Sequence, residues 1–153
     1  MKTMVTLEYV LPGTTSEIST YFSNFQLFGK YHPYMIEVTE LENTSTSIQK
    51  YHVRESLTLW NFIPMKPSYD VEVCILEPEK HICYQSEVHK GVFLEINYTF
   101  IEDLHTNTVK VLEAMVVKGY PIINPIFIGI LKRSRILLIE SIREAQTKKY
   151  ALS

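Results

Sequence analysis

The C-terminal part of the chain constrains the fold most, because residues 124–149 have the pattern of one long, mostly apolar helix. This helix follows a stretch, from about residue 35 to residue 118, in which apolar and polar residues alternate as in β-strands. A helix with so much apolar surface needs a packing partner in water, and a sheet of sequential strands has one face to cover. The pattern therefore predicts an α+β fold in which a curved antiparallel sheet packs against the helix and leaves room for a cavity.

The alternating pattern divides into about seven strands, with polar or proline-containing turns between them. In residues 47–60, Tyr51, Val53 and Leu57 share one face with Glu55. In residues 108–118 both faces are largely apolar, so the inward face of that strand stays open. The predicted strands are residues 4–11, 35–41, 47–60, 68–76, 81–88, 92–102 and 108–118, and residues 42–46 and 61–67 are expected to be loops.

One or two short helices are expected between the first two strands. Thr14 and Glu17 have the spacing of a capping box, and Ile18, Tyr21, Phe22 and Phe25 follow at helical spacing, up to an exit at residues 28–29.

For the C-terminal helix, we expect Asn124 as the N-cap and Pro125 at the first helical position. Its predicted inner stripe is Phe127, Ile130, Leu131, Leu137, Leu138, Ile142 and Ala145. Lys132, Arg133 and Arg135 are assigned to a solvated face. Ile128, Ile136 and Ile139 also fall outside the stripe, either as ordinary exposed residues or as a contact face for a second copy or a membrane.

Composition narrows the class of protein. The 153 residues suit one domain, 1–153, and a net charge of −2 with thinly spread Lys and Arg argues against a nucleic-acid partner. We find no signal peptide and no apolar run long enough to span a membrane, so a cytoplasmic location is expected, with transient membrane contact left open. Whether the protein is a monomer or a homodimer is also left open.

The two cysteines are expected to face each other across a hairpin. If the chain turns at residues 77–80, Cys74 pairs with Cys83, Val73 with Tyr84, and Leu76 with His81. The two interpretations are a redox-active cross-strand pair and two reduced neighbouring thiols, and the expected compartment favours reduced thiols.

The order of the predicted elements resembles the helix-grip fold, which START domains, the major birch pollen allergen, polyketide cyclases and coenzyme Q-binding proteins (the SRPBCC superfamily) share. The resemblance covers essentially the whole chain. Residues 28–33, with the sequence Phe-Gly-Lys-Tyr-His-Pro, and residues 107–111 are similar to characteristic segments of this superfamily. Neither segment is a catalytic signature, so the resemblance implies a fold rather than a chemistry.

The resemblance implies a hydrophobic tunnel between the sheet and the C-terminal helix that binds a lipid, isoprenoid, polyketide or other apolar small molecule. The expected ligand-binding residues are Tyr51, Val53, Glu55, Leu57, Trp60, Tyr69, Val71, Val73, Tyr84, Leu94, Ile96, Tyr98, Phe100, Phe127, Ile130, Leu131 and Leu138. Because successive turns of a meander alternate ends, one end of the sheet should gather residues that either ring an entrance or plug the core. These residues are Tyr31, His32, Trp60, Phe62, Ile63, Met65 and Tyr120.

Three residues are candidates for chemistry. Glu55 should point inward, where an unpartnered carboxylate is costly and its pKa rises, so it could hold a ligand hydroxyl or act as a base. Glu113 would do the same if residues 111 and 115 point inward, and His32 lies near the expected entrance. The alternatives are carboxylates paired with Arg or Tyr and a histidine on the surface. No spacing indicates a metal site or a cofactor.

Three functions remain open. The first is binding of a hydrophobic small molecule without chemistry. The second is a cyclase- or dehydratase-like enzyme that uses Glu55 or His32 on a polyketide-like substrate. The third is a protein-interaction module with a filled cavity and a contact face at Ile128, Ile136 and Ile139.

Overall fold

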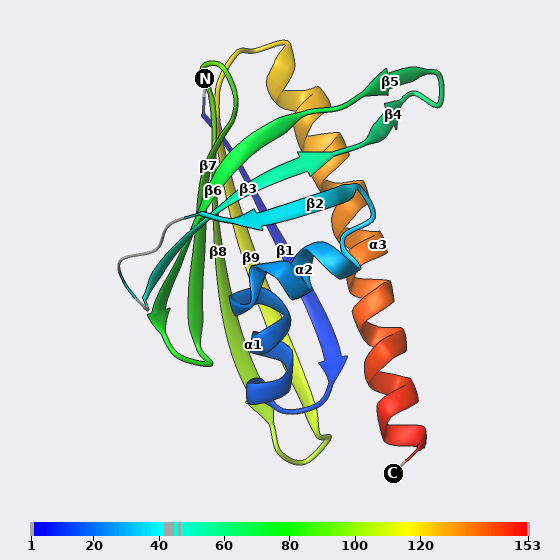
Figure 1. Cartoon of the computed structure of the whole chain (residues 1–153). Coiled ribbons are helices and arrows are strands. Elements are labelled where there is room, and N and C mark those ends of the chain that lie inside the picture. Colours follow the sequence, from blue (N-terminus) through cyan, green and yellow to red (C-terminus); the bar gives the residue numbers. More distant parts are fainter. Residues whose placement is uncertain (1, 42–44, 46, 153) are drawn as a thin grey trace.

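The structure is a computed structural model that describes residues 2–41, 45 and 47–152. Within these residues, seven antiparallel strands form one twisted sheet in the order β1-β9-β8-β7-β6-β3-β2, and α1, α2 and α3 pack on one face of it (Figure 1). The strands are β1 Lys2–Pro12, β2 Met35–Glu40, β3 Ile48–Glu55, β6 Ser68–Glu77, β7 His81–His89, β8 Val92–Asp103 and β9 Thr108–Lys118. The expected α+β architecture is confirmed. The predicted loop at 42–46 lies, except for residue 45, outside the described residues.

The predicted long strand at 47–60 is wrong in its second half. β3 ends at Glu55, and the Ser56 amide leaves the sheet to donate to the Tyr34 carbonyl at 2.8 Å. The chain then forms a separate two-stranded ribbon from β4 (Leu57–Leu59) and β5 (Ile63–Met65), which projects away from the sheet (Figure 1). Positive φ angles of 52° at Trp60 and 65° at Asn61 make the tight turn between these two short strands.

The β6–β7 hairpin has the predicted register over most of its length. Cys74 lies opposite Cys83 and Val73 opposite Tyr84. The predicted pairing of Leu76 with His81 is wrong, because a β-bulge shifts the register and places Glu77 opposite His81. Both cysteines are free thiols.

The structure shows which face of β9 points inward, a question that the sequence left open. Val109, Val111, Glu113, Met115 and Val117 of β9 are all buried. The alternate residues face away from the helices, because strand residues point to opposite sides of the sheet in turn. A carboxylate, Glu113, therefore sits in the middle of an otherwise apolar inner surface.

Two short helices fill one half of the covered face. α1 (Thr15–Ser23) begins with the predicted capping box, in which Thr14 accepts from the Glu17 amide and Glu17 accepts from the Thr14 amide at 3.1 Å. α2 (Phe25–Tyr31) continues past the predicted exit at 28–29. Gly29 stays inside this helix because it packs directly on Val38 of β2, where a larger residue would collide.

The long helix α3 (Ile123–Ala151) buries a different face from the one predicted. Ile122 occupies the N-cap position and makes no side-chain cap hydrogen bond. The predicted N-cap Asn124 is instead buried in the first turn, where it donates to Thr3 Oγ1 at 3.3 Å. The buried stripe runs at helical spacing through Asn124, Ile128, Leu131, Arg135, Leu138, Ile142 and Gln146, with Ser134 and Ile139 beside it.

Several assignments on α3 are therefore wrong. Ile128 and Ile139 are buried, so the predicted outer isoleucine face reduces to Ile136, which is 58% exposed. Leu137, predicted to be inside, is 38% exposed, and Arg135, predicted to be solvated, is 3% exposed. The reason is that three polar residues occupy the inner stripe, which an apolar pattern alone cannot reveal.

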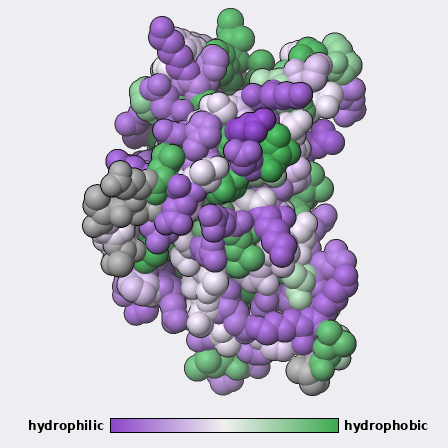
Figure 2. All heavy atoms as spheres, in the orientation of Figure 1, coloured by the Kyte–Doolittle hydropathy of each residue, from purple (hydrophilic) through white to green (hydrophobic). Residues whose placement is uncertain are grey.

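Exposed apolar residues are dispersed rather than gathered over α3. Figure 2 shows a face on which hydrophilic and hydrophobic residues alternate over short distances. Trp60 and Phe62 at the tip of the ribbon and Ile122 before α3 are 61%, 72% and 80% exposed. None of the helices in the described part of the chain combines the length and the apolar character that a membrane-spanning helix requires.

Candidate functional site

A cavity of about 330 Å³ lies between the first half of α3 and the sheet. Phe25 and Phe28 of α2 close it on one side, and the aromatic cluster beneath them fills the rest of the covered face. The cavity exists because α1 and α2 occupy only part of the space under α3. Its volume is at the small end of the range for ligand pockets, about 300–1,000 Å³, and therefore suits a compact ligand.

Ten of the expected ligand-binding residues border this cavity. They come from the sheet, from β4 and from α3, and they are Glu55, Leu57, Tyr69, Val71, Tyr84, Leu94, Ile96, Phe127, Ile130 and Leu131.

The other seven expected residues lie elsewhere. Trp60 is exposed at the tip of the ribbon, and the rest belong to the solid core beside α1 and α2: Tyr51, Val53, Val73, Tyr98, Phe100 and Leu138. Aromatic packing explains this, since the Phe22 ring packs at an angle of 49° against the Tyr98 ring, with centroids 4.7 Å apart, and leaves no space there.

The seven residues expected to ring an entrance or plug the core are only partly gathered at the cavity. His32 and Met65 border the cavity, together with His89 at the end of β7 and Ile123 at the start of α3. Trp60, Phe62, Ile63, Tyr31 and Tyr120 do not border it. The ribbon turns its apolar tip outward, because the break at Ser56 separates it from the sheet.

Glu55 and Tyr69 form one polar pair in the cavity wall. Glu55 is the last residue of β3, and the neighbouring strand β6 places the Tyr69 hydroxyl so that it donates to Glu55 Oε2. Burial raises the pKa of Glu55, while the Tyr69 hydrogen bond and the positive charge of Arg135 act in the opposite direction. Burial, and then the Glu55 charge, raises the pKa of Tyr69 well above its usual value. Glu55 is therefore a carboxyl group that binds a proton more readily than an exposed glutamate.

Glu113 and Arg135 form a second, fully buried pair. Arg135 Nε donates to Glu113 Oε2 at 2.6 Å, and the Tyr9 hydroxyl of β1 donates to Glu113 Oε1 at 2.9 Å. The Arg135 side chain is 4% exposed and the Glu113 side chain is 0% exposed. Burial, the largest single influence, lowers the pKa of Arg135. The charge and hydrogen bond of Glu113, together with Tyr98 and Tyr9, raise it by more, so the guanidinium holds its proton more tightly than usual. Glu113 does not border the cavity, whereas Arg135 does.

His32 is buried, not on the surface. Its Nδ1 accepts the Tyr34 backbone N–H at 3.1 Å, so Nε2 carries the proton in the neutral ring. Burial, helped by the positive charge of Arg135, lowers the pKa of His32 to about 3. At neutral pH it is therefore a neutral hydrogen-bond donor in the cavity wall.

Sequence reasoning missed several residues at this site, above all Arg135, Phe25, Phe28 and Tyr34. The sequence did contain a signal for Arg135. It lies four positions after Leu131 and eight after Phe127, and residues at this spacing lie on the same face of a helix. Within the described residues, no group of three or more His, Cys, Asp or Glu side chains is placed to bind a metal.

A larger hollow of about 740 Å³ lies over outward-facing residues of the sheet. It is open to solvent, and charged side chains such as Lys50, Glu72, Glu95 and Lys118 border it. It lacks the covering helix and the deep apolar wall that a small-molecule site needs. The cavity under α3 is therefore the candidate site.

Similar folds occur among solved structures. The Zhui aromatase/cyclase from Streptomyces sp. R1128 aligns with a TM-score of 0.76 at 10% identity, over 98% of this chain and 96% of that one. Ara h 8.0201 aligns with a TM-score of 0.73 at 8% identity, over 97% and 99% of the two chains. The di-domain aromatase/cyclase StfQ from the steffimycin biosynthetic pathway aligns with a TM-score of 0.75 at 10% identity, over 99% of this chain and 52% of that one.

No protein-family model matches the sequence, and no curated protein matches it. At identities this low, the structural similarities establish a shared fold and nothing about chemistry.

Proposed function

From the helix-grip fold of this chain, we propose that the protein binds a compact hydrophobic small molecule in the cavity under α3. The observation that carries the proposal is the cavity itself, which has mostly apolar walls and a smaller number of polar groups, including Glu55, Tyr69, His32 and Arg135. Apolar walls with a small number of placed polar groups are the usual composition of a ligand pocket. The similar solved structures support the proposal, because they include aromatase/cyclases with the same fold.

A neutral fluorescent probe, N-phenyl-1-naphthylamine, tests this proposal. We expect saturable binding to the wild-type protein and at least tenfold weaker binding to Ile130→Trp, because Ile130 borders the cavity and tryptophan would fill it. Ile136→Trp is the matched control, since Ile136 lies on the same helix and is exposed. Equal affinity in the two variants would show that the probe binds elsewhere and would overturn the proposal.

A second candidate is proton transfer on a bound carbonyl compound, as in a cyclase or dehydratase. The raised pKa of Glu55 inside the cavity favours it, because a more basic carboxylate removes a proton from carbon more readily. In this step Glu55 would take a proton from the carbon beside the carbonyl, leave an enolate, and return the proton to carbon.

Deuterium exchange into 2-tetralone in D₂O measures this step directly. We expect the wild-type protein to accelerate the exchange and Glu55→Gln to lose the acceleration, while Glu87→Gln, an exposed carboxylate at the end of β7, keeps it. If the wild-type protein binds 2-tetralone without accelerating exchange, the protein is a binder and this second candidate is wrong.

A further inference from the structure

The guanidinium of Arg135 contains a buried hydrogen-bond donor for which the described residues provide no acceptor. Arg135 Nη1 is buried and has no hydrogen-bond partner among the residues that the structure describes. Nε of the same guanidinium donates to Glu113, and Cζ lies over the Phe28 ring, 5.4 Å from the ring centroid. A contact with an aromatic ring leaves the in-plane N–H groups of a guanidinium without a hydrogen-bond acceptor. Leaving such a buried N–H without an acceptor is costly.

The position of Arg135 relates this donor to the cavity. Ile123, Phe127, Leu131 and Arg135 follow one another at intervals of four residues, and all four border the cavity. At 1.5 Å per residue they extend over about 18 Å along α3. The three apolar residues occupy the part of this line that starts at the beginning of the helix, and the guanidinium is at its inner end. A ligand on this line would have its apolar body on Leu131 and Phe127 and its polar end at Arg135.

The charges around Arg135 decide which polar end fits. Glu113 already neutralises the guanidinium, and His32 is a neutral ring that accepts from Tyr34. The remaining carboxyl group in the wall is Glu55, which Tyr69 contacts. A ligand carboxylate would add an uncompensated negative charge to a buried, balanced pair, which costs far more than burying a neutral acceptor.

We propose that the cavity selects ligands with a neutral carbonyl oxygen, as in a ketone, ester or amide, and binds that oxygen to the Arg135 guanidinium. This inference rests on the proposed binding function and narrows its ligand class. Arg135 serves here as the specificity-determining donor, while Glu113 and Phe28 hold it in position.

Three naphthalene derivatives of similar shape test the inference: 2-ethylnaphthalene, 2-acetylnaphthalene and the anion 2-naphthoate. We expect the ketone to bind at least tenfold more tightly than the hydrocarbon, as for a hydrogen bond to a charged group, and the carboxylate to bind more weakly than the ketone. Equal affinities of ketone and hydrocarbon would overturn the inference while leaving the binding function intact. Tightest binding of 2-naphthoate would also overturn it. If none of the three binds and the fluorescent probe does not bind either, the proposed function itself fails.

A charge-balanced variant separates recognition from folding. Arg135→Met combined with Glu113→Gln removes both charges and keeps an acceptor for the Tyr9 hydroxyl. We expect it to lose the preference for the ketone, so that 2-acetylnaphthalene and 2-ethylnaphthalene bind this variant with affinities within about twofold of each other, as expected without a hydrogen bond to a charged group. Lys132→Met, an exposed change on the same helix, should keep the preference. The infrared C=O stretch of bound 2-acetylnaphthalene should shift to lower wavenumber in the wild type and not in the double variant, and an unshifted band in both would contradict the contact.

Discussion

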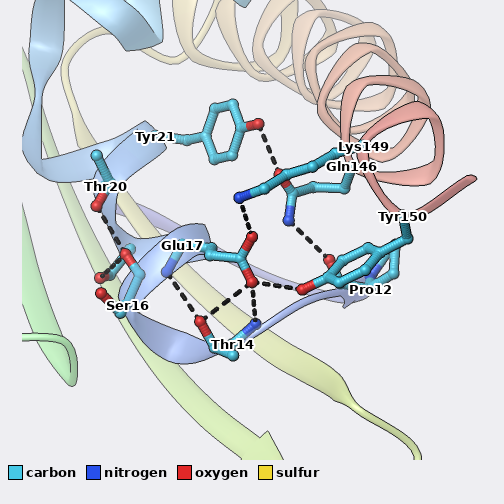
Figure 3. A network of polar contacts seen from close by, with 10 residues as sticks. Pro12, Thr14, Ser16, Glu17, Thr20, Tyr21, Gln146, Lys149 and Tyr150 are labelled. Atoms are coloured by element: carbon cyan, nitrogen blue, oxygen red, sulfur yellow. Dashed lines mark hydrogen bonds and ion pairs between the residues drawn. The ribbon is translucent and has the colours of Figure 1, made fainter. Parts of the chain in front are cut away.

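Gln146 of α3 accepts a hydrogen bond from the Tyr21 hydroxyl of α1 at 2.8 Å and belongs to a polar network that fastens the C-terminal end of α3 (Figure 3). The Gln146 amide also donates to the Pro12 carbonyl at 3.1 Å. Beside it, Glu17 accepts from both Lys149 and Tyr150. The helix that covers the cavity is therefore anchored by polar contacts at the end remote from the cavity.

Glu17→Gln should lower the free energy of unfolding by about 1 kcal/mol at pH 7, as for the loss of a helix-capping contact. The hydrogen bonds from Lys149 and Tyr150 lower the pKa of Glu17 to about 2. Its stabilisation is therefore present above about pH 4.5 and is lost as the pH falls toward 2. In urea unfolding, the wild type and Glu17→Gln should differ at pH 7 and converge below pH 4.5. Glu144→Gln, in an exposed pair with Lys148, should have little effect. A difference that stays constant with pH would contradict this explanation.

His32 should make stability depend on pH in a higher range. Its pKa is lowered from 6.5 to about 3 on folding, so the unfolded chain binds more protons between these values. The stabilisation that depends on neutral His32 is therefore fully present above about pH 6.5 and is lost as the pH falls toward 3. By pH 5 the loss from this one residue should be about 2 kcal/mol.

The test for His32 compares unfolding curves at pH 7.5 and pH 5. His32→Asn keeps an acceptor for the Tyr34 amide but cannot titrate, so it should lose about 2 kcal/mol less than the wild type between the two values. His105→Asn, at an exposed turn, serves as the control. Identical pH dependence in the wild type and His32→Asn would show that another group is responsible.

Gly29→Ala should destabilise the protein although alanine favours helices. An added Cβ would collide with Val38, so the free energy of unfolding should fall by about 1–3 kcal/mol. In a Val38→Ala background the same change should cost less or even stabilise. Gly129→Ala is the matched control, because an added Cβ there meets nothing within 4 Å, and it should stabilise α3 by about 0.5–1 kcal/mol. Equal effects at the two glycines in chemical denaturation would refute the packing argument.

The buried pair of Glu113 and Arg135 should be more sensitive to the loss of one member than of both. Glu113→Gln and Arg135→Met should each cost about 3–5 kcal/mol, because each leaves an uncompensated buried charge. The double variant should be more stable than either single variant. Urea unfolding of the four proteins in a double-mutant cycle measures the coupling, and additive losses would show that the pair is not coupled.

The two thiols should react slowly in the folded protein. Burial and then the Glu95 charge raise the pKa of Cys83 to about 12, and burial followed by Glu72 raises the pKa of Cys74. Since the thiolate is the reactive form, Cys83 in a Cys74→Ser variant should react with dithiobis(nitrobenzoate) at pH 8 roughly a thousandfold more slowly than in urea. A rate similar to that in urea would contradict this and would favour a redox-active pair.

Local patterns predicted several features that depend on a residue's immediate neighbours in the sequence. The capping box at Thr14 and Glu17 and the register that places Cys74 opposite Cys83 follow from spacing alone. Alternation also placed Tyr51 and Val53 on the buried face of β3. The helix-grip fold could be predicted because the order of the main strands and helices matched one arrangement, although the strand predicted at 47–60 ends at Glu55.

The face of α3 could not be found in the same way. Asn124, Arg135 and Gln146 lie on its buried stripe, and each is buried because it meets a partner far away in the sequence: Thr3 for Asn124, Glu113 for Arg135, and Tyr21 for Gln146. An apolar pattern assigns such residues to the surface, since it cannot include a partner that only the fold supplies.

The sequence by itself determined a sheet, a covering helix and the apolar walls of a space between them. It could do so because buried residues recur at every second position of a strand and about every 3.6 positions of a helix. The tertiary structure decided how much of that space is filled and which polar groups face it. Phe22 and Tyr98 fill one half by packing against each other, and α2 stops short of the other half. Arg135 enters the wall only because Glu113, 22 residues away in the sequence, pairs with its charge.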